Sequence, residues 1–291
     1  MPTFTTPNPI RAHVEVPLGD VHLTADDRTT TVVEVQPSDP ANDEDVRAAE
    51  LTQVEYTDGR LRVLGPKHTA TAMRSWLSRS WGGSIDVTIQ LPAGSDLEAT
   101  VGAADLQADG RLGDTRIKTG LGRVRLEATG ALDVDSGAGE VSIDHIGGHA
   151  TIKAGSGEVR IGELADTAVV RNSNGATWIG AARDHLRVKA ANGSVDIEHV
   201  EGDTVAKSAN GSIRVRDVLR GSVVLETSMG NIEIGIPEGT AAWIDANTTA
   251  GTIRNELDEA TKPGEATEKA QVRARTSVGQ ILIRRSHPAE A

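Results

Sequence analysis

A short glycine motif that recurs about every eighteen residues constrains this chain more than any other feature. In most copies a Val, Ile or Leu occupies the second and fourth positions after the glycine. Regular copies begin at Gly122, Gly139, Gly157, Gly175, Gly193, Gly211 and Gly230, and less regular copies begin at Gly251 and Gly279. The regular spacings are 17, 18, 18, 18, 18 and 19 residues, followed by 21 and 28. Such self-similarity is the signature of a repeat architecture.

A second strand precedes each glycine. Apolar residues recur five positions before it and small residues three positions before it, as with Ile152 and Ala154 ahead of Gly157. Alternation with period two places both columns on one face of a strand. One coil cannot bury that face alone, whereas stacked coils cover one another. We therefore predict an all-β fold: a β-solenoid (β-helix) of about 18-residue coils, each with two or three strands, and an irregular β-rich N-terminal cap.

Asparagine precedes the repeat glycine in three consecutive coils, at Asn174-Gly175, Asn192-Gly193 and Asn210-Gly211. Both residue types tolerate the positive φ that a tight corner needs. Stacked asparagines can also hydrogen-bond from one coil to the next. We therefore interpret this column as structural.

The chain divides into two regions by pattern. Residues 1–95 are predicted to form the cap, with a short helix near Val46–Glu50 and a hairpin around Asp58-Gly59. Residues 96–291 are predicted to form the repeat region, with a polar loop near 255–271. After that loop we expect the chain to return to strand at Val272–Thr276 and to close the stack with Gly279–Ile283.

Composition excludes several classes of protein. The chain has no Cys, which excludes disulfides, thiolate zinc sites and Cys nucleophiles. Its net charge of −12 disfavours nucleic acid as a partner. The first residues lack the pattern of a secretory signal, and no stretch of eighteen apolar residues occurs, so we predict no transmembrane segment and a cytoplasmic location. Peripheral membrane contact is not favoured.

Three stretches carry a family resemblance. They are Gly19-Asp20-Val21 with Asp27-Arg28-Thr29, the run Ile85-Asp86-Val87-Thr88-Ile89-Gln90-Leu91-Pro92-Ala93-Gly94, and the Asn-Gly-x-[Val/Ile] coils. The sequence resembles the bacterial β-strand-repeat proteins called "putative adhesin", a family of unknown function, in the version found in high-GC actinobacteria. The likeness covers most of the chain. It implies a solenoid with a non-catalytic role and offers no catalytic motif.

Catalytic and metal-binding patterns are sparse. A polysaccharide-cleaving β-helix enzyme needs carboxylates and a base grouped on adjacent coils. The nearest candidates are Asp133, Asp135, Asp144, His145 and His149, which we interpret as solvated polar residues. The calcium-binding pattern Gly-Gly-x-Gly-x-Asp is absent. We expect no metal and no cofactor.

The outward position four residues before the repeat glycine carries a basic stripe. It reads Lys118, Asp135, Lys153, Arg171, Lys189, Lys207 and Glu226 in successive coils. Neighbouring coils are about 4.8 Å apart, so Lys153, Arg171, Lys189 and Lys207 are predicted to form a ladder of cations. This ladder could dock an acidic protein surface or an anionic polymer. The alternative is that the stems cover the sheet and the charges are solvated or paired with nearby acids.

A second candidate for partner docking lies in 67–83. Met73, Trp76, Leu77 and Trp81 fall near helical spacing. The alternative is that this segment plugs the end or flank of the solenoid.

Three functions remain open. The first is a non-catalytic scaffold or protein-interaction module with an unknown protein partner or with itself as partner. The second is an adhesin-like or envelope-associated binding protein. The third, which we favour least, is a carbohydrate-active β-helix enzyme.

Overall fold

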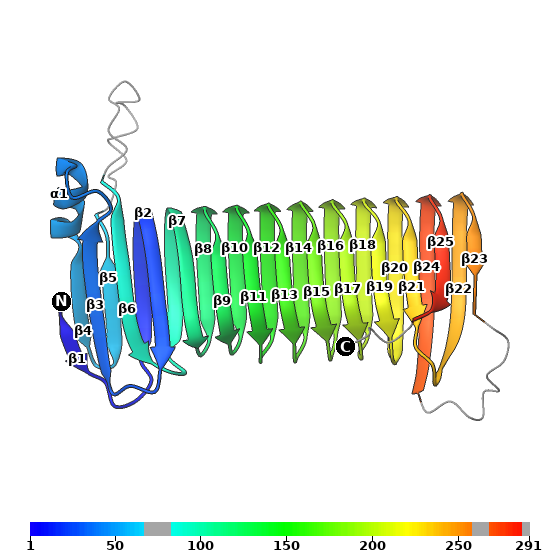
Figure 1. Ribbon diagram of the computed structural model, residues 1–291, viewed down its shortest axis with the longest axis horizontal. Helices are drawn as coiled ribbons and strands as arrows, with labels where there is room; N and C mark the ends of the chain where they lie inside the picture. The colour runs from blue at the N-terminus through cyan, green and yellow to red at the C-terminus, as the bar shows by residue number, and fades with distance from the viewer. Residues whose placement is uncertain (67–82, 258–267, 287–291) are drawn as a thin grey trace, which may run out of the picture. The chain divides into compact units, whose positions relative to one another are not determined.

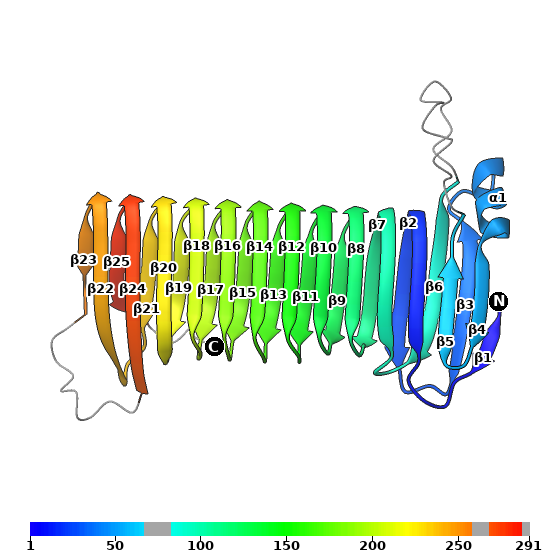
Figure 2. The ribbon, with the colours of Figure 1, turned by 180° about the vertical axis from the view of Figure 1, so that it is seen from behind.

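The computed structural model describes residues 1–66, 83–257 and 268–286. The chain splits into two compact units, Met1–Ile143 and Asp144–Ala291. The described residues contain one helix, α1 (Asp43–Leu51), and are otherwise built of β-strands. The predicted all-β solenoid is therefore confirmed, and its regular coils contain two strands each (Figures 1 and 2). The boundary drawn between 95 and 96 stays a prediction.

Unit 1 begins with strands that differ from the regular repeat. Its strands are β1 (Thr3–Thr5), β2 (Arg11–Asp26), β3 (Thr30–Pro37), β4 (Gln53–Thr57), β5 (Arg60–Leu64), β6 (Ile85–Pro92), β7 (Asp96–Arg111), β8 (Thr115–Leu121), β9 (Val124–Thr129) and β10 (Leu132–Ala138). The next strand, β11 (Val141–Ile146), crosses the boundary between the units. Strands β1 and β3 are antiparallel to their partners, whereas β2 and β7 are parallel to each other over their length.

The cap contains a hairpin and a short helix. Strands β4 and β5 pair antiparallel around Asp58 and Gly59, which both have positive φ (49° and 75°). Helix α1 begins three residues earlier than the sequence indicates, because Asn42 caps it by accepting a hydrogen bond from the backbone N–H of Glu44 (3.0 Å). The acidic residues of its first turn also suit the positive end of the helix dipole.

Unit 2 consists of two parallel sheets that share every coil. The first sheet contains β12 (Ala150–Ser156), β14 (Ala168–Asn174), β16 (Leu186–Asn192), β18 (Thr204–Asn210), β20 (Gly221–Met229), β24 (Glu268–Val278) and β22 (Thr240–Ala250), in that order. The second contains β13 (Val159–Leu164), β15 (Thr177–Ala182), β17 (Val195–Val200), β19 (Ile213–Val218), β21 (Ile232–Ile236), β25 (Ile281–Arg285) and β23 (Ile253–Asn255).

The core of unit 2 is a stack of identical positions. Val170 pairs in register with Val188, and Val188 with Ala206, and all three side chains are fully buried. Each Val or Ile contributes about 1.5–3 kcal/mol when it is covered in this way. The predicted inward columns are thus confirmed, and the residues between them face outward.

At the corner after β14, β16 and β18, the residue with positive φ differs from the sequence expectation. Among the described residues other than glycine, positive φ occurs only at Asp58, so the corner's positive φ falls on Gly175, Gly193 and Gly211 and not on the asparagines. The asparagines instead form the predicted ladder: Asn192 donates to Asn174 (2.9 Å), and Asn210 donates to Asn192 (3.0 Å).

The stacking order at the C-terminal end corrects the sequence prediction. The coil that comes last in the chain, β24 with β25, does not close the stack. It lies between the coil of β20 and β21 and the coil of β22 and β23 (Figure 2). The reason is visible in the inward positions. Asn255 of β23 occupies the position of Ile283 in β25, so the coil with a polar inward residue takes the less covered place.

No helix in the described residues is long and apolar enough to cross a membrane.

Candidate binding face

The basic stripe lies on the outward side of the first sheet of unit 2. Parallel pairing places Lys153 beside Arg171, Arg171 beside Lys189, and Lys189 beside Lys207. All four side chains are exposed. We call these four residues the basic ladder, and we call the outward side of β12, β14, β16 and β18 the basic face.

Most of the basic ladder is not neutralised. Lys207 forms an ion pair with Glu226 (2.6 Å), which lies beside it in β20. Lys153, Arg171 and Lys189 form no ion pair with any other residue in the described part of the chain. Like charges placed opposite each other on neighbouring strands destabilise a sheet. The fold therefore keeps three cations in register without the acids that would offset their repulsion.

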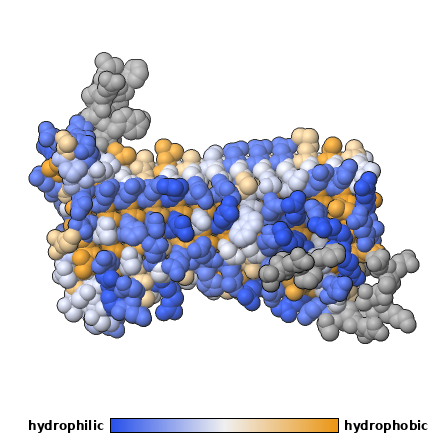
Figure 3. Space-filling model, in the orientation of Figure 1, coloured by the Kyte–Doolittle hydropathy of each residue, from blue (hydrophilic) through white to orange (hydrophobic). Residues whose placement is uncertain are grey.

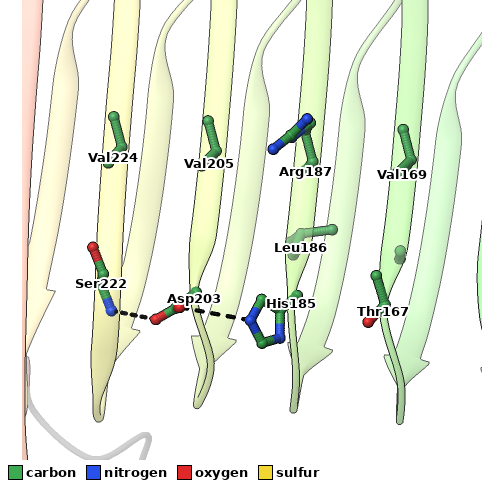
Figure 4. Close-up of a pocket in the computed structure, with 10 residues that line it drawn as sticks. Thr167, Val169, His185, Leu186, Arg187, Asp203, Val205, Ser222 and Val224 are labelled. Carbon is green, nitrogen blue, oxygen red and sulfur yellow. Dashed lines mark hydrogen bonds and ion pairs between the residues drawn. The ribbon is translucent and has the colours of Figure 1, made fainter.

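A second outward column runs beside the basic ladder, two residues earlier in each strand. It contains Val169, Arg187, Val205 and Val224, and Figure 4 shows these side chains in one row across four strands. The row forms the wall of a hollow of about 530 Å³. Arg187 adds another exposed cation that forms no ion pair within the described residues. The hollow therefore offers both apolar surface and positive charge next to the basic ladder.

A third outward column lies two residues after the basic ladder. It contains Gly155, Ser173, Ala191 and Ala209. Gly155 has no side chain and the other three side chains are small, so little projects from the sheet here beside the long stems of lysine and arginine. The basic face thus provides a shallow track along which an extended chain can contact the cations.

The lower edge of the hollow holds a histidine between carboxylates. His185 Nδ1 lies 2.5 Å from Asp184 Oδ1, and His185 Nε2 lies 3.6 Å from Asp203 Oδ2. The hydrogen bond with Asp184, helped by the charges of both acids, raises the pKa of His185 above its ordinary value. The backbone N–H of Ser222 donates to Asp203 Oδ1 (2.9 Å; Figure 4). Because both ring nitrogens face carboxylates, this group favours holding positive charge over activating the Ser222 hydroxyl.

On the second sheet of unit 2, several arginines form ion pairs with glutamates. Arg160 pairs with Glu158 (2.5 Å), Arg216 with Glu198 (2.5 Å), and Arg183 with Glu163. Glu233 lies between two more cations, Arg214 (3.0 Å) and Arg284 (2.7 Å). These acids neutralise the arginines in place, whereas the basic face leaves its charge available to a partner.

Of the five residues considered for catalysis, Asp133 and His145 each face an ionisable side chain of a neighbouring strand, whereas Asp135, Asp144 and His149 form no ion pair within the described residues. Asp133 faces Arg116 at 3.4 Å on the outward side of β10 and β8. His145 faces Glu163 at 3.4 Å. No group of three or more metal-ligating side chains occurs in residues 1–66, 83–257 and 268–286. Met73, Trp76, Leu77 and Trp81 lie outside the described residues.

Sequence reasoning missed the hollow. Arg187, His185 and Asp203 follow the same period as the basic ladder, a few positions earlier in each coil. A search for charge along every outward column, in place of one, could have found Arg187. No sequence signal indicates that His185 lies between Asp184 and Asp203.

The comparison with protein families identifies the class. The family described as Toastrack DUF4097 matches residues 13–286, so the chain belongs to that family. None of the curated proteins matches the chain.

Solved structures include two similar chains. One is a "putative cell adhesion protein" of Clostridium sporogenes, with 12% identity, a TM-score of 0.23, and 98% of each chain covered. The other is a "putative adhesin" of Bacteroides fragilis, with 12% identity, a TM-score of 0.33, and 97% of this chain and 95% of that chain covered.

Proposed function

We propose that this protein is a non-catalytic binding scaffold that docks an extended, acidic protein segment on the basic face of unit 2. One observation carries the proposal. Lys153, Arg171 and Lys189 stand in register without ion-pair partners, in a chain whose net charge is −12. An acidic segment would relieve their mutual repulsion, which an isolated molecule must tolerate.

The shape of the basic face supports a protein segment in an extended conformation. The cations are about 4.8 Å apart across the strands. An extended chain in the polyproline II conformation rises about 3.1 Å per residue and turns once every three residues, so acidic side chains on every third residue, about 9.3 Å apart, would face about every second cation. The low column with Ala191 and the apolar wall with Val205 flank this path.

The absence of a catalytic role belongs to the same proposal. Among the described residues that line the hollow, His185 is the one histidine, and its ring nitrogens face Asp184 and Asp203. A general base needs one ring nitrogen within hydrogen-bond reach of the proton that it removes. Both ring nitrogens of His185 face carboxylates of the chain itself, so the ring offers neither nitrogen to a substrate.

The experiment uses reversal of charge with a matched control. A fluorescent poly-glutamate peptide should bind the wild-type protein at low salt, with affinity that falls as salt rises. Glutamate at the four positions of the basic ladder should weaken binding at least tenfold. The control carries glutamate at four exposed arginines of unit 1 that lack ion pairs in the described residues and shifts the net charge equally: Arg60, Arg62, Arg111 and Arg125. If peptide binding weakens equally in both variants, net charge alone explains the effect, and the proposal is contradicted.

A photo-cross-linking experiment in cells extends the test to the natural partner. A photoreactive residue at Ala191 should capture an acidic protein, and capture should disappear when the basic ladder is reversed. The same group at Ala181, in the second sheet, is the control. If Ala191 captures the same protein with and without the basic ladder, the face does not act through these cations.

The place of action is a further part of this proposal. We propose a cytoplasmic location, which cell fractionation tests. Recovery of the protein with the cell envelope would instead favour the adhesin-like or envelope-associated alternative. The likeness to actinobacterial proteins also stays a prediction.

A further inference from the structure

The C-terminal coil of unit 2 has open edges on both sheets. Among the described residues, β22 pairs only with β24, and β23 pairs only with β25. Alternate backbone N–H and C=O groups along the other edge of both strands therefore have no strand partner. Exposed edges of this kind are sites where another chain can add a strand.

Side chains at this end are exposed where the same positions are buried in other coils. Ile253 is 44% exposed, whereas Ile281 and Ile232, in the next two coils, are fully buried. Ile244 is half-buried, whereas Val272 beside it is fully buried. The side chains are of the same kind, so the missing neighbour accounts for the difference.

Apolar surface continues from this end along the adjoining corner. Met229 (56% exposed) and Val278 (53% exposed) take the place that the asparagines hold in earlier coils, and Ala250 follows them. Figure 3 shows hydrophobic atoms gathered on this corner over the last coils, beyond a hydrophilic stretch. Contiguous exposed apolar surface next to an open edge marks an interaction site.

We propose that the open coil of β22 and β23 is a homodimer interface, at which two copies of this chain meet end to end. A single added peptide can pair with one edge only. A partner that covers both edges must present two strands with the spacing of the two sheets, and the coil end of a second copy does so by construction.

The N-terminal part of the chain does not supply that partner surface. Strands β1 and β4 run antiparallel to the strands beside them, so they do not form a parallel two-strand coil end. The matching surface is therefore the same end of the second copy. A two-fold axis perpendicular to the sheets would place β22 antiparallel to its counterpart, and β23 likewise.

The charges at this end permit such an isologous contact. The inward positions of β22 and β23 carry Ala242, Ile244, Ala246, Thr248, Ile253 and Asn255, none of which is charged. The acid of β22, Asp245, faces Arg273 (3.3 Å) and Arg275 (3.9 Å) of the neighbouring strand. The charge of Asp245 is thus offset within each copy. Arg254, the outward residue of β23, forms no ion pair within the described residues, so the symmetric contact leaves one like-charged pair on its outward side.

The first test is the mass of the full chain in solution. Sedimentation equilibrium should give twice 30.5 kDa at micromolar concentration. Ile253→Glu should shift the protein to the monomer, because each copy would place a carboxylate in the contact. Leu121→Glu is the matched control: Leu121 is similarly exposed (58%) but lies in β8. A monomeric wild type, or a dimer that survives Ile253→Glu, would overturn the proposal.

A second test does not depend on the stability of that variant. The chain has no cysteine, so a single cysteine introduced at Ala242, Ile244 or Ala246 can be cross-linked only to the equivalent cysteine of a second copy. A short bismaleimide should join two copies through at least one of these positions, and it should not cross-link a Leu121→Cys variant. If none of the three positions joins two copies, the proposed pairing is wrong. Capture of a different protein there in cells would assign the edge to a foreign strand instead.

Discussion

Asn192 donates a side-chain hydrogen bond from Nδ2 to Oδ1 of Asn174, which lies one coil earlier, over 2.9 Å. Asn210 makes the same bond to Asn192 one coil later (3.0 Å). Asn192 is therefore both donor and acceptor, and the three amides form a chain across three coils.

Asn192→Ala should lower the free energy of unfolding by about 1–2 kcal/mol, because it removes two partly exposed hydrogen bonds. Urea denaturation measures the change. Ser156→Ala is the control, since Ser156 shares the corner column and its side chain makes no hydrogen bond in the described residues. It should change stability by less than about 0.5 kcal/mol. Equal losses in the two variants would mean that the ladder contributes nothing.

Gly193→Ala should be among the most damaging single substitutions. Gly193 has a φ of +147°, and a Cβ there would lie 2.0 Å from the carbonyl oxygen of Gly175 in the neighbouring coil. We expect a loss of at least about 3 kcal/mol, because backbone strain and a backbone clash act together. Gly59→Ala separates the two effects: its φ is +75°, but a Cβ there meets nothing within 4 Å. That control should lose only about 1 kcal/mol, and similar losses would show that the clash is relieved.

The regular coils were predictable because one pattern repeats. Period-two alternation places Val170 and Val188 inward and Arg171 and Lys189 outward, and the 18-residue period aligns each pair. Each position is set by its own neighbours in sequence, so no distant contact is needed to find it. The same local logic found the hydrogen-bonded asparagines.

The order of the last coils was not predictable in the same way. Sequence shows that Asn255 interrupts an inward column, but it does not show which coil will cover which. Insertion of β24 between β20 and β22 depends on contacts across tens of residues. The hollow was missed for a related reason, since Asp203 meets His185 only after stacking joins two coils.

Lys189→Gln should stabilise the protein at low salt. Lys189 lies between Arg171 and Lys207, so its removal relieves two repulsions. Exposed charges interact weakly, and we expect a gain of about 0.5 kcal/mol that disappears at about 1 M salt. Lys207→Gln is the matched comparison, because it also breaks the ion pair with Glu226 and should gain less. Denaturation at two salt concentrations measures both variants. A gain for Lys189→Gln that is independent of salt would point to a cause other than charge.

Thr204→Val should also stabilise the protein, by about 1 kcal/mol. Thr204 is fully buried between Leu186 and Val223, and its hydroxyl oxygen has no hydrogen-bond partner. Replacing an unsatisfied buried hydroxyl with a methyl of the same shape removes a desolvation penalty. Thr240→Val provides the contrast, because the Thr240 hydroxyl donates to the carbonyl oxygen of Leu219 (3.1 Å) and the substitution should destabilise. Thermal unfolding distinguishes the two signs.

His185 should titrate above its ordinary value in the folded protein. The hydrogen bond with Asp184 and the nearby charge of Asp203 raise its pKa, and Arg187 is the cation that lines the same hollow. A raised pKa means that the folded state binds the proton more tightly than the unfolded chain. The contribution to stability is therefore present below the unfolded pKa and is lost as pH rises through the higher folded pKa. Titration of the ring by NMR measures the shift. Asp184→Asn should remove most of it and Asp203→Asn only a little; the reverse order would mean that Asp203 dominates.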